Sequence, residues 1–144
     1  MKNVKNKKEI TNAEWSVMRI VWTLDKVKGS RIINLMLKKK NWKKSTVETL
    51  LHRLLKKDML NVIRSGRSFI YFPNIKEQDA IDLAVSNLFD NICSMHAGET
   101  LLNLLSNLVL SKDDIKKLSV KLNKKISSAP NKVKCNCLNK KECF

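Results

Sequence analysis

The most constraining stretch of this 144-residue chain is KKSTVETLLHRLLKKDML, from Lys43 to Leu60. Four apolar side chains recur in it at positions i, i+3, i+4 and i+7. This spacing predicts an α-helix that buries one face against the rest of a domain. The buried stripe consists of Val47, Leu50, Leu51 and Leu54. The opposite face carries hydroxyls, an imidazole and cations, namely Ser45, Thr49, His52 and Lys56, with Thr46, Glu48 and Arg53 at its edges.

A polar and basic helix face has two interpretations: it lies against DNA, or it is an ordinary solvated surface. The charge distribution favours DNA. The chain has a net charge of +16, and residues 1–75 hold 18 lysines and arginines against five acidic residues. Residues 76–126 hold seven of each sign. This asymmetry predicts a polyanion-binding module joined to a neutral unit that packs.

Two further helices are expected before this stretch. Thr11 and Glu14 have the spacing of a capping box, which predicts a helix from there to about Asp25. Ser30 is a plausible N-cap for a second helix, about Arg31 to Lys40. The side chains expected in the core are Trp15, Met18, Val21, Trp22, Ile32, Ile33, Leu35 and Met36.

After Asp58 the apolar period changes from 3.6 to 2, which predicts a hairpin of residues 60–64 and 68–73 around a turn at Gly66. Three helices followed by a hairpin is the order of a winged helix-turn-helix, in which the third helix enters the major groove. A hairpin that only covers the core, with Arg64 and Arg67 serving solubility, remains an alternative. The residues expected at the groove are Lys44, Ser45, Thr46, Thr49, His52 and Arg53, and those expected near phosphates are Lys43, Lys56, Arg64 and Arg67.

In residues 76–126, which are rich in leucine, the apolar spacing predicts three short amphipathic helices, at about 76–93, around 101–109 and about 112–126. Fifty residues cannot bury three such stripes alone. Pairing with a second copy would bury them and would set two DNA-reading helices one turn apart, although packing against the first domain is an alternative. We therefore expect a mainly α protein in three parts: a winged-helix domain (1–75), a small helical dimerisation domain (76–126) and a flexible tail (127–144).

The tail holds Cys135, Cys137 and Cys143 after a linker that contains Pro130. Thiolates at Cys-x-Cys spacing can bind one ion, and soft sulfur ligands select Cu(I) and Zn(II). The alternative is a cluster of exposed cysteines without a role. Cys93, in an apolar helical setting, is expected to pack as a small hydrophobic side chain.

Other classes of protein are disfavoured. Two histidines stand in no catalytic or metal-binding spacing, and three glycines form no phosphate-binding loop, so we expect no enzyme. The N-terminus lacks an apolar signal segment, and the longest apolar stretch is too short to span a bilayer. We therefore expect a cytoplasmic protein without a membrane partner.

Two motifs resemble a known family: A-E-W-x-V-M from Ala13 to Met18, and T-x-x-T-L-L-x-R-L-x-K-K from Thr46 to Lys57. Over about residues 9–126 the chain resembles the penicillinase repressor family, which includes the β-lactamase repressors BlaI and MecI and the copper-responsive repressor CopY. The resemblance implies a homodimer that represses transcription at a palindromic operator of double-stranded DNA. Glu48 stands where relatives often carry Lys or Arg.

The tail is most similar to the C-x-C-x4-C-x-C signature of CopY-type repressors, in which zinc supports DNA binding and Cu(I) displaces it. Here the second spacer has five residues, and no fourth cysteine follows Cys143. The resemblance thus implies release from DNA by Cu(I). Two alternatives stand beside it: a β-lactamase-type repressor relieved by proteolysis, with Asn103-Leu104 at the position cut in those relatives, and a sequence-independent DNA-binding protein.

Overall fold

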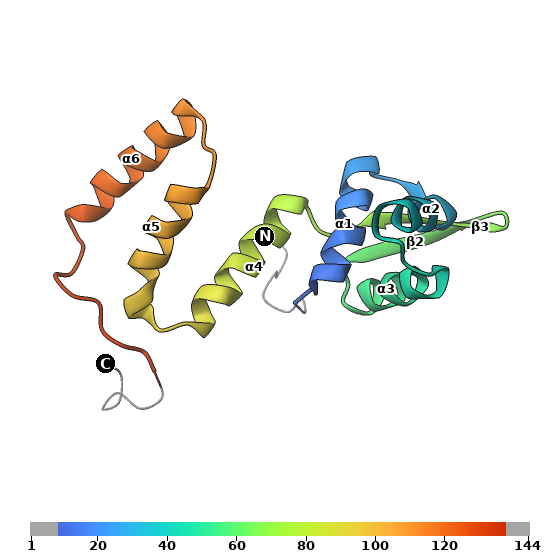
Figure 1. Ribbon diagram of the computed structural model, residues 1–144, viewed down its shortest axis with the longest axis horizontal. Coiled ribbons are helices and arrows are strands. Elements are labelled where there is room, and N and C mark those ends of the chain that lie inside the picture. The colour runs from blue at the N-terminus through green and yellow to red at the C-terminus, as the bar shows by residue number, and fades with distance from the viewer. Residues whose placement is uncertain (1–8, 138–144) are drawn as a thin grey trace. The chain divides into compact units, whose positions relative to one another are not determined.

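The computed structural model describes residues 9–137 of the chain (Figure 1). These residues form two compact units that divide after Ser86. The first unit contains three helices, a small sheet and the start of a fourth helix, and the second is helical. Among the described residues, no helix is both long and apolar enough to cross a lipid bilayer.

Helix α1 (Asn12–Leu24) begins with the predicted capping box. The Glu14 amide donates to the Thr11 hydroxyl at 3.3 Å, and the Thr11 amide donates to the Glu14 carboxylate at 2.8 Å. Trp15 and Trp22 are only half-buried and pack at the edge of the core, with ring centroids 5.5 Å apart. The capping prediction is confirmed, whereas both tryptophans are less buried than expected.

Helix α2 (Gly29–Lys40) begins two residues earlier than predicted, because Lys28 and not Ser30 is its N-cap. The two preceding residues form β1 (Val27–Lys28), a strand that the sequence pattern did not predict. Extended backbone therefore leads straight into the helix. Gly29 suits this junction, since a Cβ there would lie 3.0 Å from the Tyr71 ring.

Helix α3 (Lys44–Lys56) buries the whole predicted stripe, Val47, Leu50, Leu51 and Leu54. The hairpin that follows consists of β2 (Leu60–Ser65) and β3 (Ser68–Pro73), which pair antiparallel. Gly66 turns the hairpin with a φ of 63°, a left-handed conformation that favours glycine. Strand β1 pairs with β3, so the sheet order is β1-β3-β2, and the hairpin tip projects beyond the helices (Figure 1).

An ion pair lies beside this core. Glu14 is 1% exposed, and its carboxylate lies 2.6 Å from the Lys57 ammonium. Lys57 also donates to the Glu9 carbonyl at 2.9 Å. A buried charge is stable only when it is paired, so this contact joins the start of α1 to the end of α3.

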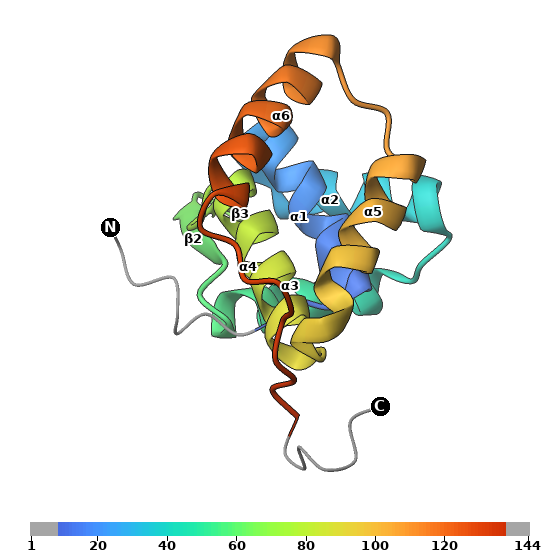
Figure 2. The ribbon, with the colours of Figure 1, turned by 90° about the vertical axis from the view of Figure 1, so that its left-hand side faces the viewer.

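The second unit is built from helices that bury little. Helix α4 (Glu77–Asn91) starts in the first unit, where Ala80 belongs to the core, and continues past Ser86. A 3-10 turn, η2 (Ser94–His96), leads to α5 (Ala97–Asn107) and α6 (Lys112–Ile126) (Figure 2).

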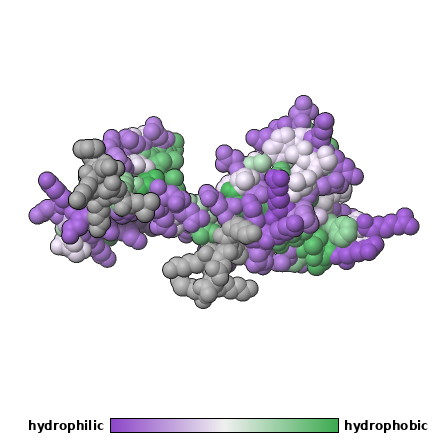
Figure 3. All heavy atoms as spheres, turned by 90° about the horizontal axis from the view of Figure 1, so that it is seen from below, coloured by the Kyte–Doolittle hydropathy of each residue, from purple (hydrophilic) through white to green (hydrophobic). Residues whose placement is uncertain are grey.

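Helix α6 begins with a capping box between Ser111 and Asp114, which confirms the predicted start; hydrogen bonds from Ser111 lower the pKa of the Asp114 carboxyl. Helices α5 and α6, which are described in full, bury none of their residues. Hydrophobic side chains accordingly reach the surface of this unit (Figure 3).

Breaking the ion pair between Glu14 and Lys57 should lower the stability of the first unit. Replacing Lys57 by Met leaves the buried Glu14 carboxylate without its cation, which should cost about 3 kcal/mol of unfolding free energy. Lys56→Met, at an exposed neighbouring position, should change stability by less than about 0.5 kcal/mol. Urea unfolding followed by circular dichroism measures both, and equal stabilities of the two variants would contradict the assignment.

Candidate nucleic-acid interface and cysteine cluster

The face of α3 opposite the buried stripe is exposed to solvent. All the positions on and beside this helix that the sequence predicts to contact DNA are exposed. We call this surface the α3 outer face; its residues are Lys43, Lys44, Ser45, Thr46, Thr49, His52, Arg53 and Lys56. The burial of the stripe fixes which side chains the helix presents.

The hydroxyl of Thr49 has a defined orientation on this face. It donates to the Ser45 carbonyl at 2.9 Å, a back-bond within the helix. Its proton is therefore committed to the backbone, and its oxygen remains an acceptor. In a major groove such an oxygen can accept from the exocyclic amine of cytosine or adenine.

Glu48 is the one acid on this helix. Its carboxylate lies 3.7 Å from the Lys44 ammonium, and both side chains are more than half exposed. Such a pair contributes little to stability. Glu48 also acts on Tyr71 of β3: burial raises the pKa of the Tyr71 hydroxyl, and the Glu48 charge raises that pKa further. Tyr71 is therefore a neutral phenol at neutral pH.

A hollow of about 370 Å³ connects the α3 outer face to the hairpin. Lys44 and Glu48 line it from α3, and Arg67 lines it from the hairpin. The hollow is also lined by residues of β1 and α2, none of which the sequence placed near DNA: Lys28, Ser30, Ile33 and Asn34. Their position depends on the pairing of β1 with β3, and a two-residue strand leaves no periodic signal in a sequence.

Both arginines of the hairpin are exposed beside its turn. Arg64 is held there by a hydrogen bond from its Nε to the Gly66 carbonyl, at 3.2 Å. The hairpin thus presents two cations at its projecting end. We call this end, residues 64–67, the wing tip.

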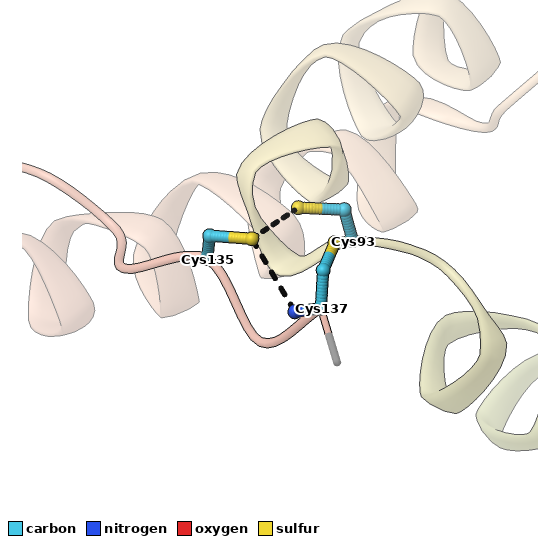
Figure 4. Close-up of side chains that lie close together, drawn as sticks. All are labelled: Cys93, Cys135 and Cys137. Carbon is cyan, nitrogen blue, oxygen red and sulfur yellow. Dashed lines mark hydrogen bonds between the residues drawn. The ribbon is translucent and has the colours of Figure 1, made fainter. Parts of the chain in front are cut away.

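A second candidate site lies in the second unit, where three cysteines meet. Cys93 follows α4, and Cys135 and Cys137 belong to the tail (Figure 4). The three sulfur atoms lie within 4.8 Å of one another, and all three residues are half-buried. We call Cys93, Cys135 and Cys137 the cysteine cluster. The Cys93 and Cys135 sulfurs are 3.6 Å apart, well beyond the about 2.05 Å of a disulfide bond.

The structure brings Cys135 and Cys137 together, whereas Cys143 lies outside the described residues. The expectation for Cys93 needs correction, since this residue lies against the tail sulfurs instead of packing only among apolar side chains. Its partner Cys135 is 42 residues away in sequence, and no local spacing of residues predicts such a contact.

The cluster suits a thiophilic metal ion. Sulfur ligands lie about 2.3 Å from zinc, so two of them in a tetrahedral site are about 3.8 Å apart. The sulfur separations in the cluster, 3.6 Å for one pair and at most 4.8 Å for all, are of this size. Little movement would be needed to bring all three thiolates to one ion.

Comparisons with known proteins agree with the sequence motifs. A sequence profile of the penicillinase repressor family matches residues 10–124. An uncharacterized 16.5 kDa protein of Latilactobacillus sakei is 42% identical over 96% of this chain and 95% of its own length. The penicillinase repressor of Bacillus licheniformis is 33% identical over 76% of this chain and 86% of its own.

Among solved structures, the DNA-binding domain of the repressor BlaI is 39% identical, covers 51% of this chain and 92% of its own, and has a TM-score of 0.48. The family profile covers most of the chain and ends before the tail cysteines. The chain belongs to the penicillinase repressor family, whose members are DNA-binding transcriptional repressors and not enzymes.

Proposed function

We propose that this protein is a homodimeric repressor that binds a palindromic operator through the α3 outer face of each subunit. Cu(I), by displacing zinc at the C-terminal cysteines, releases it from DNA. The geometry of α3 is the main support for DNA binding: four apolar residues are buried, and the opposite face, which is basic and polar, is exposed. Such a protein acts where the chromosome is, in the cytoplasm.

The α3 outer face carries the chemistry that base recognition needs. A major groove of about 12 Å admits one α-helix. Arg53 and Lys44 can donate to guanine, and the Thr49 oxygen can accept from an exocyclic amine. The residues proposed for the groove are Lys44, Ser45, Thr46, Thr49, His52 and Arg53.

Phosphate contacts supply most of the affinity in this arrangement. Lys43 and Lys56 stand at the two ends of α3, and Arg64 and Arg67 stand at the wing tip. Cations placed at the ends of a recognition helix and along a wing fix the register of the protein on the duplex without reading its sequence. Lys28, which lines the hollow beside Arg67, adds a further cation to this set.

The second unit supports dimerisation. Helices α5 and α6 expose large apolar side chains that neither helix buries. These include Leu102 at 66% exposed, Leu122 at 56% and Ile126 at 75%. A two-fold partner would cover such a surface, and the same symmetry would present two α3 helices to two half-sites.

The copper response is supported by the cysteine cluster and by its place in the chain. Thiolates prefer Cu(I) and Zn(II), and the family profile ends at residue 124, before the tail cysteines. Trigonal Cu(I) is satisfied by three sulfurs, whereas tetrahedral zinc needs four ligands. The sequence predicts Cys135, Cys137 and Cys143 as the ligands. A fourth zinc ligand would come from Glu142, water or a thiolate of the partner subunit.

A second candidate function is a β-lactamase-type repressor that proteolysis inactivates. The names of the relatives favour it, since several are penicillinase or methicillin-resistance regulators. Asn103-Leu104 lies inside α5, however, and proteases act preferentially on exposed loops. A third candidate, sequence-independent DNA binding, predicts equal affinity for operator and scrambled DNA.

Glu48 tests the orientation of α3. Glu48→Lys removes an anion from the DNA-facing surface and adds a cation, so it should tighten operator binding and steepen its salt dependence by about one unit of log K per log salt. Asp79→Lys makes the same charge change on α4 and should have little effect. Fluorescence anisotropy at several salt concentrations measures both. Unchanged affinity and base preference in Glu48→Lys would show that the helix is oriented differently.

Arg67 tests the wing tip. Arg67→Ala should weaken binding to operator and to scrambled DNA by a similar factor and should reduce the salt slope by about 1, because a phosphate contact is lost. Arg19→Ala, on α1, is the matched control and should bind as the unchanged protein does. Loss of operator affinity alone would instead assign Arg67 to base recognition.

The tail cysteines test the copper response. With Cys135, Cys137 and Cys143 all replaced by Ser, the protein should still bind its operator but should no longer leave it when Cu(I) is added. A gel shift under anaerobic, reducing conditions, first with zinc and then with Cu(I), measures this release. If Cu(I) released the triple variant from DNA as it releases the unchanged protein, the copper mechanism would be contradicted. The proposal of DNA binding would be unaffected.

A further inference from the structure

We propose that Cys93 is itself a ligand of the metal centre, which therefore joins the corner after α4 to the tail. This inference deepens the proposed function, on which its regulatory meaning rests. A centre confined to the tail would leave Cys93 without a part in metal binding. The structure instead places its sulfur among those of the tail (Figure 4).

The distances carry the proposal. The Cys93 sulfur lies 3.6 Å from that of Cys135, and all three sulfurs of the cluster fall within 4.8 Å. Tetrahedral thiolate ligands of one zinc ion lie about 3.8 Å apart, and those of a trigonal ion only slightly farther apart. The same three residues are half-buried, which keeps part of the bulk water away from the site.

Two hydrogen bonds hold the tail in this place. The Ser94 amide donates to the Asn136 side-chain oxygen at 2.9 Å, so the residue between the two tail cysteines is fastened next to Cys93. The Cys137 amide donates to the Cys135 sulfur at 3.3 Å. An amide directed at sulfur stabilises the thiolate, which is the form that binds metal.

The ligand set defines the metal class. The group consists of three sulfurs, with no imidazole or carboxylate among the described members. An all-thiolate set selects Cu(I) or Zn(II) over the hard cations Mg²⁺ and Ca²⁺. Three sulfurs complete a trigonal Cu(I) site, and zinc would take one more ligand.

Cys93 would connect the metal centre to the end of α4, a connection that ligands in the tail alone do not make. Helix α4 runs from the first unit, where Ala80 sits in the core, to Asn91, two residues before Cys93. A metal bound by Cys93 is therefore attached to the end of the helix that leaves the DNA-binding unit. A change in ligand number or geometry at Cys93 would bias the conformation of that helix end, which is the coupling that metal-controlled release needs.

Cobalt(II) binding to the full chain tests the proposal without DNA. The reduced protein is titrated anaerobically, and the sulfur-to-cobalt charge-transfer absorption reports the number of thiolate ligands. Cys93→Ser should lower this absorption by one ligand's share and should weaken Cu(I) affinity, measured by chelator competition, at least about tenfold. Cys93→His keeps a ligand atom and should regain affinity with a shifted spectrum.

Ser94→Ala is the matched control, because it changes the neighbouring side chain and keeps the amide that holds Asn136. It should bind Co(II) and Cu(I) as the unchanged protein does, and circular dichroism should show equal helix content in all variants. Wild-type spectrum and affinity in Cys93→Ser, with both lost in Cys135→Ser/Cys137→Ser, would overturn the role of Cys93 and leave the tail centre standing. Wild-type binding in both variants would overturn the metal centre altogether, whereas operator binding is judged separately by gel shift.

Discussion

The arrangement of the DNA-binding unit depends on the burial of the α3 stripe. Val47, Leu50, Leu51 and Leu54 each transfer their side chains from water to the core, which stabilises the unit by about 1.5–3 kcal/mol per large side chain. Because the four residues occupy one face, their burial also fixes the rotation of α3 about its axis. The α3 outer face is open to DNA for the same reason that the stripe is closed to water.

Much of this fold follows from the sequence because its signals are local. The capping boxes of α1 and α6, the stripe of α3 and the period-2 hairpin are each set within a few residues. The start of α2 was missed because β1 exists only through its pairing with β3. The position of Cys93 was missed for a similar reason: its contact with Cys135 joins residues 42 apart, and no periodicity encodes such a contact.

The two units divide the physical tasks. The first holds the excess of positive charge, with 18 cations against five acidic residues over residues 1–75, and can attract a polyanion over a distance set by salt. The second carries little net charge up to residue 126, with six lysines against four acidic residues over residues 87–126, so little repulsion opposes the pairing of two copies. It also exposes the apolar surface that a copy would cover. The cysteine cluster lies in this second unit. Under the proposed mechanism, a metal bound there would act on the first unit along the chain, through α4.

The most direct test of the central claim is the ratio of two affinities. The full chain, loaded with zinc, is titrated against a palindrome from its own upstream DNA and against a scrambled duplex of equal length and composition, at one fixed salt concentration. For a sequence-specific dimer, the palindrome should bind at least about a thousandfold more tightly than the scrambled duplex, with one dimer per site. Equal affinity for the two duplexes would contradict it, because a helix placed only against phosphates cannot distinguish them.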